Sequence, residues 1–388
     1  MLDVIELFGE RTTRDELGLG SVRDAFADLL FPGTSTIQTR AKYFLFVPWM
    51  YLLLEQRRTS SATVAMKARK LESQLMQAIE ESGDTSGLIG RLAKENVRRL
   101  SGSVYWQGLF SWGIRLFTGS QDEYHRSLDM FYLRRQKRRA SQEQYEGESY
   151  YSEPSNWHAG IPTVPEDFPG QATFALNRIE ATYLREQVLT NHRASLLAFL
   201  LRKQFPVQGI RFAWELSAEF NEFLQEQIEH GRNFSELMLG AQLLYNLLLA
   251  EKRNWQDQID LYRQALAEWG EMVDMRANAL EVWDRQRFWK TVYSGNPRVH
   301  TRAKSFIDRW LDLVMGSSPR EILESSSARQ LVALREAQLK GGLARLKNDR
   351  ALEVWNGAAG AGQMDLRWNS ARGIISDILA GLGEDNHA

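Results

Sequence analysis

The sequence contains no cysteine in its 388 residues. Disulfide bonds and thiolate metal sites are therefore excluded, and the composition does not point to an oxidising compartment. The first residues include Asp3 and Glu6, whereas a secretory signal needs a basic start followed by a long apolar run. We therefore expect a cytoplasmic protein.

Long apolar segments are also missing. The two most hydrophobic stretches, residues 44–54 and 237–250, are shorter than the roughly 20 apolar residues that a helix needs to cross a bilayer. Pro48 also interrupts the first of them. We predict that both stretches are buried helices and that the protein has no membrane partner.

Charge of one sign is not in excess. Lysine and arginine total 48 against 49 acidic residues, which gives a formal net charge of −1. A surface that is basic throughout is excluded, so any site for a nucleic acid must be local. The 6 histidines lack the spacing of a zinc site. We predict neither a metal nor a cofactor.

Catalytic motifs are absent as well. The glycine-rich residues 357–362 have neither the preceding strand nor the following Lys-Ser/Thr pair of a phosphate-binding loop, and a flexible connector is expected there. Ser111 lies in a segment whose spacing differs from that of a nucleophile elbow, which indicates a structural role. Glu226 and His230 stand at helical spacing, but no second Glu-x-x-His pair completes a di-metal site. We therefore expect that the protein is not an enzyme.

What the sequence does have is helical periodicity. Hydrophobic residues make up 43% and charged residues 25%, the balance of a folded globular chain. No stretch alternates with period two over several residues, so the fold class is predicted to be all-α, a multi-helix protein. Thr13 and Glu16 fit a capping box, and a helix is expected to start there. Further helices are predicted over residues 37–54, 62–81, 104–117, 121–139 and most of 174–388.

The composition changes between residues 140 and 172. This segment is rich in Ser, Gln, Tyr and Gly, and it has prolines at positions 154, 162, 165 and 169, which exclude a regular helix. The chain is also longer than the roughly 250 to 300 residues at which a single hydrophobic core stops growing. We predict two helical lobes, residues 1–139 and 173–388, joined by an irregular Pro/Ser/Gly-rich linker at 140–172.

A basic stretch ends the predicted helix over 121–139. Guanidinium groups bind phosphates in a bidentate manner, so a local patch of this kind suits the backbone of double-stranded DNA without reading its sequence. The alternative is a solvated helix end that the helix dipole stabilises. The cations of the stretch are Arg134, Arg135, Lys137, Arg138 and Arg139.

A second candidate for an anion site is the turn that precedes the helix predicted over 37–54. Thr34 and Ser35 offer hydroxyl groups, and Arg40 and Lys42 follow on the expected helix. Amide groups at a helix N-terminus, hydroxyl groups and nearby cations together favour a phosphate. The alternative is ordinary N-capping by the hydroxyl groups.

Four stretches carry a resemblance to a known family. They are Arg-Asp-Glu-Leu-Gly-Leu-Gly at 14–20, Leu-Phe-Pro-Gly-Thr-Ser-Thr at 30–36 continuing to Phe-Val-Pro-Trp at 46–49, Tyr-Trp-Gln-Gly-Leu at 105–109 with Trp-Gly-Ile-Arg at 112–115, and Met-Asp-Leu-Arg-Trp at 364–368. These stretches resemble an uncharacterised bacterial family, a domain of unknown function associated with mobile anti-phage defence islands beside helicase and phospholipase-D-like nuclease genes. The resemblance runs from end to end and implies a role in defence against phage or foreign DNA, but it implies no catalytic residue.

Two hypotheses follow. In the first, the protein is a non-enzymatic subunit of a bacterial defence system that contacts DNA through the basic stretch and the Thr34–Lys42 turn and scaffolds helicase or nuclease partners. In the second, it is a protein-binding scaffold or regulator without direct nucleic-acid contact, which uses its tryptophans and proline-rich segment as partner surfaces. Salt-dependent DNA binding by the isolated protein would separate the two hypotheses.

Overall fold

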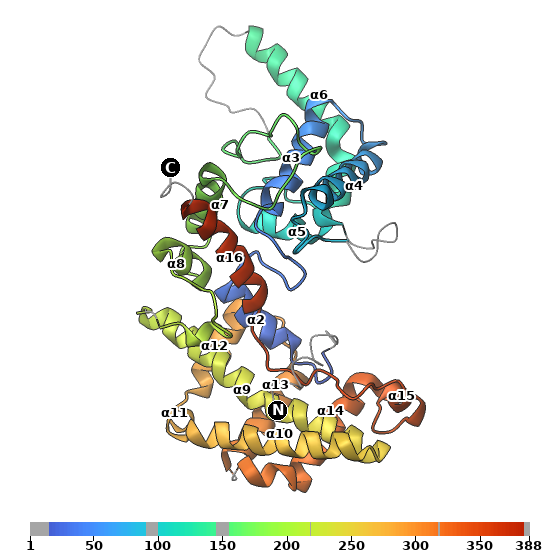
Figure 1. The fold of residues 1–388 in the computed structure, drawn as a ribbon, viewed down its shortest axis with the longest axis vertical. Coiled ribbons are helices and arrows are strands. Elements are labelled where there is room, and N and C mark those ends of the chain that lie inside the picture. Colours follow the sequence, from blue (N-terminus) through green and yellow to red (C-terminus); the bar gives the residue numbers. More distant parts are fainter. Residues whose placement is uncertain (1–14, 91–99, 145–154, 218, 317–318, 384–388) are drawn as a thin grey trace. The chain divides into compact units, whose positions relative to one another are not determined.

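The computed structural model describes residues 15–90, 100–144, 155–217, 219–316 and 319–383, and for residues 139–144 it describes the backbone alone (Figure 1). Within these ranges the predicted all-α fold class is confirmed, because the regular elements are helices and the only extended pairing is an isolated bridge between Arg115 and Trp157. In the same ranges, no helix combines the length and the apolar character that a membrane crossing requires.

The chain divides into two compact units, and each is assembled from segments that are distant in the sequence. Unit 1 comprises residues 1–30 and 212–366, and unit 2 comprises residues 31–211 and 367–388. These boundaries do not coincide with the predicted lobes at 1–139 and 173–388.

The segment predicted as a linker falls inside unit 2. Its residues 145–154 lie outside the described part of the chain, but Trp157 is only 1% exposed and Phe168 only 6%. Trp157 stacks on Tyr51, with ring centroids 5.7 Å apart, and meets Tyr124 edge-on. Prolines do exclude a regular helix here, yet the aromatic side chains between them bury apolar surface in the unit, so this irregular backbone is part of a core.

Unit 1 is built around α9 (Glu222–Arg253), which packs against α2, α10, α13 and α14. The predicted buried helix at residues 237–250 is confirmed as the central part of α9. Gly240 permits a close approach, because a Cβ atom there would stand 2.3 Å from the ring of Trp269. Trp269 and Trp310 also donate ring N–H groups to the carbonyl oxygens of Glu236 and Leu237. The described elements around α9 are α2 (Gly20–Leu30), η2 (Ala213–Glu215), α10 (Gln256–Met275), α11 (Ala277–Glu281), α12 (Arg285–Gly295), α13 (Thr301–Gly316), η3 (Pro319–Leu323), α14 (Ser326–Lys340), η4 (Gly341–Leu343) and α15 (Asp349–Glu353).

The start of α2 differs from the prediction. Thr13 lies outside the described residues, and the helix begins at Gly20. The carboxylate of Asp15 accepts the backbone N–H groups of Leu19 and Gly20 at 2.7 and 2.6 Å, so Asp15 satisfies the exposed donors at this helix end.

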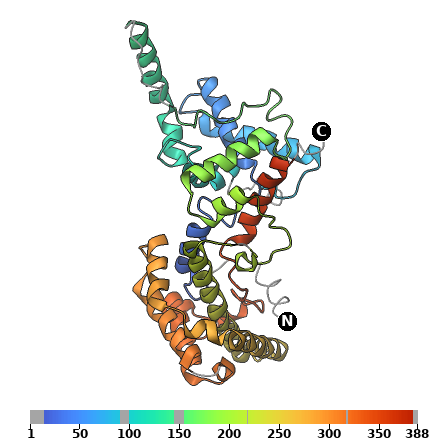
Figure 2. The same cartoon turned by 90° about the vertical axis from the view of Figure 1, so that its left-hand side faces the viewer.

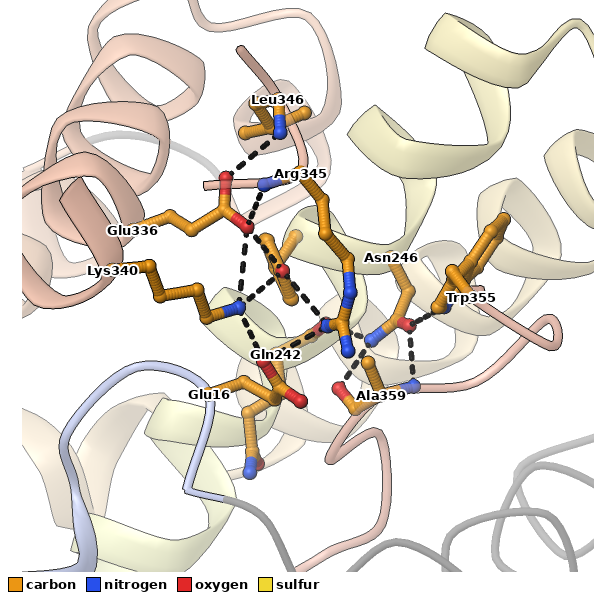
Figure 3. A network of polar contacts seen from close by, with 10 residues as sticks. Glu16, Gln242, Asn246, Glu336, Lys340, Arg345, Leu346, Trp355 and Ala359 are labelled. Carbon is orange, nitrogen blue, oxygen red and sulfur yellow. Dashed lines mark hydrogen bonds and ion pairs between the residues drawn. The ribbon is translucent and has the colours of Figure 1, made fainter. Parts of the chain in front are cut away.

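A charge-balanced polar network fixes the N-terminal segment of unit 1 (Figure 3). Glu336 is fully buried, and its carboxylate accepts the hydroxyl of Tyr245 at 2.6 Å and the backbone N–H groups of Arg345 and Leu346 at 2.8 and 3.0 Å. Lys340 and Arg345 pair with Glu16. Burial alone would raise the pKa of Glu336. The hydrogen bonds from Tyr245 and the two backbone N–H groups act in the opposite direction, as does the charge of Lys340. Together they outweigh the effect of burial, and the pKa of Glu336 is lowered. Because two carboxylates face two cations and Glu336 is well supplied with donors, we assign this network to stability.

The glycine-rich residues 357–362 are not a free connector, so that prediction is wrong. Asn246 accepts the backbone N–H of Ala359 at 2.8 Å and donates to its carbonyl at 2.9 Å, and Trp355 donates to the same side chain (Figure 3). Tyr262 donates to the carbonyl of Gly357. Ala358, Ala359 and Ala361 are buried. Small side chains let this backbone enter the core of unit 1, where α9 and α10 satisfy its polar groups.

Unit 2 is built around α3, which is buried on nearly all sides, as predicted for residues 44–54. Phe44 stacks on Trp112 with ring centroids 3.8 Å apart. The C-terminal helix of the chain joins this unit by packing against α7 and α8. The described helices of unit 2 are α3 (Tyr43–Gln56), α4 (Val64–Ser82), α5 (Ser101–Ser111), α6 (Gln121–Gln144), α7 (Arg178–Asn191), α8 (Leu196–Lys203) and α16 (Trp368–Gly383).

The helix predicted over 37–54 begins later, at Tyr43, and no side chain caps it. Residues 31–42 form turns and irregular backbone. The hydroxyl of Tyr105 accepts the backbone N–H groups of Thr39 and Arg40 at 2.9 and 3.1 Å and donates to the carbonyl of Arg40. These bonds to α5 satisfy polar backbone groups that a helix would satisfy internally, and the sequence of the turn does not reveal them.

Candidate functional site

The basic stretch lies on the C-terminal half of α6. Arg134, Lys137 and Arg138 are exposed, whereas Arg135 is half-buried, and the side chain of Arg139 lies outside the described part of the structure. With about 3.6 residues per helical turn, Arg135 shares the packed side of α6 with Tyr124 and Leu128. The five cations predicted as one patch therefore do not share one side of the helix.

The same periodicity adds a residue that the sequence analysis missed. Arg126 is exposed and stands eleven residues before Lys137, about 20° away around the helix axis, so these two lie on one side of α6. Arg134 and Arg138 are turned from Arg126 by about 80° and about 120° around the axis. We call Arg126, Arg134, Lys137 and Arg138 the α6 basic surface. Helix periodicity applied to the whole of α6, and not to the charge run alone, could have found Arg126.

Side chains on the packed side hold α6 in unit 2. Tyr124 donates to Glu55 of α3 at 2.5 Å, Tyr132 donates to the carbonyl of Thr59 at 3.2 Å, and Asp129 accepts the backbone N–H of Ser61. The C-terminal part of α6 extends beyond the other helices of unit 2 (Figures 1 and 2). The α6 basic surface is thus presented to solvent on a helix that is anchored at its other end.

The hydroxyl groups of the predicted turn are buried, and that of Ser35 has no hydrogen-bond partner among the described residues. Thr34 is buried and donates to the carbonyl of Phe31 at 2.6 Å. The backbone N–H of Ser35 donates to the side chain of Gln38, which also donates to the carbonyl of Gly33. Because no helix begins within residues 34–42, the helix amides that the predicted anion site requires are not present at this turn.

Arg40 is compensated inside unit 2. Its guanidinium donates to Asp377 of α16 at 3.0 Å and to the carbonyl of Ser86, and it lies 4.7 Å from the ring centroid of Phe174. Burial would lower the pKa of Arg40, but the hydrogen bond and charge of Asp377 outweigh it and raise the pKa. Burial raises the pKa of Asp377 although Arg40 opposes the change. Arg40 therefore neutralises a carboxylate that is itself mostly buried.

Lys42 is compensated in the same way. It is 8% exposed, pairs with the buried carboxylate of Glu180 and donates to the carbonyl of Ala175 at 2.9 Å. Glu180 in turn completes a capping box with Asn177 at the start of α7. The ammonium of Lys42 connects the start of α3 to α7, and a phosphate could reach it only by displacing Glu180.

A polar pocket between α3, α4, α5 and α6 was not found by the sequence analysis. It has a volume of about 180 Å³. Glu72 of α4 and Tyr51 of α3 lie in it, and Gln121 donates to the hydroxyl of Tyr51 at 2.7 Å. The lining residues are Tyr51, Ala65, Ala68, Arg69, Glu72, Leu100, Ser103, Gln121, Asp122 and His125.

Glu72 carries the main charge of this pocket. It is 5% exposed, and one oxygen, Oε1, accepts the backbone N–H of Gly102 at 2.6 Å and the hydroxyl of Ser101 at 3.0 Å. These donors stand at the N-terminus of α5, where a negative charge is stabilising. Burial nevertheless raises the pKa of Glu72. The signal in the sequence is a carboxylate at position 72 on the apolar side of α4, between Ala68 and Leu75.

Two other arrangements do not support catalysis. The hydroxyl of Ser111 lies 2.9 Å from Nε2 of His192, but that nitrogen also lies 2.7 Å from the carbonyl oxygen of Ser111. A carbonyl oxygen only accepts hydrogen bonds, so Nε2 carries the proton and cannot take one from the hydroxyl. His230 accepts from Trp283 at 2.8 Å and lies beside Glu226. In the described ranges, no group of three or more His, Asp and Glu residues could hold a metal ion.

Comparison with known proteins assigns the chain to a family. Residues 2–384 match a family of unknown function, DUF6361. The chain belongs to DUF6361. No match was found among curated proteins or among solved structures. Membership of DUF6361 confirms the resemblance to a domain of unknown function, and the association with defence islands stays a prediction.

Proposed function

We propose that this DUF6361 protein is a non-enzymatic subunit that contacts the backbone of double-stranded DNA through the α6 basic surface. The observation that carries the proposal is the exposure of Arg134, Lys137 and Arg138 in the C-terminal half of α6. The C-terminal part of this helix extends beyond the other helices of unit 2 (Figure 2). The turn residues Thr34, Ser35, Arg40 and Lys42 are not part of the proposed contact. Hydrogen bonds and carboxylates inside unit 2 engage Thr34, Arg40 and Lys42, and the hydroxyl oxygen of Ser35 is buried.

The dimensions of the surface suit a phosphate backbone. At about 1.5 Å per residue, Arg126 and Arg138 are separated by roughly 18 Å along the helix axis. A DNA strand carries one phosphate per about 3.4 Å of axis, so this distance corresponds to about five phosphates of one strand. Arginine side chains bind phosphates in a bidentate manner, and such contacts position a protein on a duplex without reading its sequence.

The biological setting is also part of the proposal. The family resemblance supports a role in bacterial defence against phage or foreign DNA, in the cytoplasm, with helicase or nuclease subunits as partners. In this arrangement the partners perform the chemistry on DNA, and the present chain holds them to the duplex. Co-purification with the products of neighbouring genes tests this part, and recovery of the chain without a helicase or nuclease would contradict it.

The alternative is a protein scaffold that does not contact DNA. This hypothesis uses the tryptophans and the proline-rich segment as partner surfaces, but all 12 tryptophans are buried or half-buried. Their burial favours the DNA contact over this form of the scaffold hypothesis.

The test compares two triple charge reversals with the same net charge. The first changes the α6 basic surface: Arg134→Glu, Lys137→Glu and Arg138→Glu. The second changes exposed cations of unit 1: Lys290→Glu, Arg298→Glu and Arg350→Glu. Fluorescence anisotropy with two duplexes of unrelated sequence measures the affinity at low salt.

We expect the α6 variant to bind both duplexes at least about 100-fold more weakly, since three phosphate contacts are lost and three repulsions are introduced. The unit 1 variant should bind within about threefold of the unmodified protein, because it leaves the cations of the α6 basic surface unchanged. Equal losses of DNA affinity in both variants would mean that cations over the whole protein surface contribute to binding, and not the α6 basic surface in particular. Absence of binding by the unmodified protein would favour the scaffold hypothesis.

A further inference from the structure

We propose that the polar pocket between α3, α4, α5 and α6 binds a small organic cation with a primary amino or guanidino group, which pairs with Glu72. This ligand site goes beyond the proposed DNA contact and uses other residues.

The hydrogen bonding of Glu72 is incomplete. Both bonds from the start of α5 go to one oxygen, Oε1. Within the described residues, the other oxygen, Oε2, receives no hydrogen bond, although the side chain lines the pocket and is 5% exposed. Oε2 is not among the buried side-chain atoms that lack a partner, so it is accessible in the pocket and can accept a hydrogen bond from a ligand N–H group.

The charges of the lining residues favour a cation. The lining includes two carboxylates, those of Glu72 and Asp122, and one guanidinium, that of Arg69. Burial lowers the pKa of His125 from its ordinary value of 6.5, so the imidazole adds no positive charge at neutral pH. Two carboxylates in the lining attract a positively charged group and repel an anion.

The shape and chemistry favour an organic cation over a metal ion. Tyr51 and Gln121 add a hydroxyl and an amide to the wall, while Ala65, Ala68 and Leu100 provide apolar surface. In the described ranges, no three carboxylate or imidazole groups converge here as a metal would need. A pocket of about 180 Å³ admits a compound of a few carbon atoms.

The test uses agmatine and putrescine as probes, with glycerol as an uncharged control at constant ionic strength. Ligand-observed NMR on the full chain gives the affinity. Glu72→Gln removes the charge but keeps an oxygen that can accept from Ser101 and Gly102, so α5 keeps its cap. Glu80→Gln makes the same change on the exposed side of the same helix and is the matched control.

We expect at least one cationic probe to bind the unmodified protein and Glu80→Gln equally, and to bind Glu72→Gln at least about tenfold more weakly, as expected for loss of a charge-assisted hydrogen bond. Asp122→Asn, at an exposed position, should weaken binding by about threefold and provides the test if Glu72→Gln does not fold. Binding that is unchanged in both pocket variants, or absent for both cationic probes, would overturn the proposal. DNA affinity should be the same in Glu72→Gln, Glu80→Gln and the unmodified protein, so this result is independent of the α6 contact.

Discussion

Two regions of unit 2 concentrate arginine and lysine, and they use the charges in different ways. In the turn, the guanidinium of Arg40 and the ammonium of Lys42 lie against the carboxylates of Asp377 and Glu180. On α6, Arg134 and Arg138 are exposed along a helix that extends from the unit. The first region connects α3 to α7 and α16, whereas the second is open to solvent. The difference shows that a cation is a candidate for phosphate binding only when the fold has not already neutralised it.

Among the substitutions in these two regions, we expect that of Lys42 to cause the largest loss of stability. Lys42→Met should lower the free energy of unfolding by about 3 to 5 kcal/mol, because the buried carboxylate of Glu180 loses its cation. Lys70→Met, at an exposed position of α4, is the matched control and should change it by less than about 0.5 kcal/mol. Urea denaturation followed by circular dichroism measures both. Equal stability of the two variants would mean that Lys42 does not hold unit 2 together.

A smaller loss is expected at Arg40, and it should depend on pH. Arg40→Gln should cost about 1.5 to 3 kcal/mol at pH 7, the range for hydrogen bonds to charged groups. Burial already raises the pKa of Asp377, and without Arg40 the pKa rises further. The folded state then keeps this proton at a pH where the unfolded chain has lost it, so stability falls as pH rises above the unfolded value of about 3.9.

The difference in stability between Arg40→Gln and the unmodified protein should therefore be small near pH 4 and grow toward pH 7. Urea denaturation at several pH values measures it. A difference that stays constant over this range would show that the carboxylate of Asp377 is not the group that Arg40 stabilises.

The smallest effect on stability is expected on α6. Arg138→Gln makes the same chemical change as Arg40→Gln at an exposed position, and it should alter the free energy of unfolding by less than about 0.5 kcal/mol. DNA affinity should show the reverse order, with a loss for Arg138→Gln and none for Arg40→Gln. If both variants lost affinity equally, the distinction between the two regions would not hold.

The sequence predicts the helical class and the buried helices well, because apolar periodicity in α3 and α9 is a local property. It does not predict the position of helix ends or loops that depend on distant partners. In the irregular segment 31–42, Tyr105 of α5 binds the backbone of Thr39 and Arg40, and Asn246 and Tyr262 bind the backbone of residues 357–359. In both cases a polar side chain more than 60 positions away supplies the hydrogen bonds.

The candidate sites, too, can be predicted from the sequence only where they depend on local properties. The sequence identifies the charge run on α6, and helix periodicity then separates Arg135 from Arg134 and Lys137. The compensation of Arg40 and Lys42 by α16 and α7 requires the fold, since Asp377 stands 337 positions from Arg40. The pocket at Glu72 also requires it, because four helices contribute to its lining.

The most direct test of the proposed DNA contact is the dependence of log affinity on log salt concentration for a duplex of arbitrary sequence. We predict a linear decrease for the unmodified protein, with a slope that becomes less steep by about 0.9 for each phosphate contact removed. The variant Arg134→Gln, Lys137→Gln, Arg138→Gln should flatten the slope by about 2.7, whereas Arg40→Gln should leave it unchanged. An unchanged slope in the triple variant would contradict the assignment of the α6 basic surface as the DNA contact.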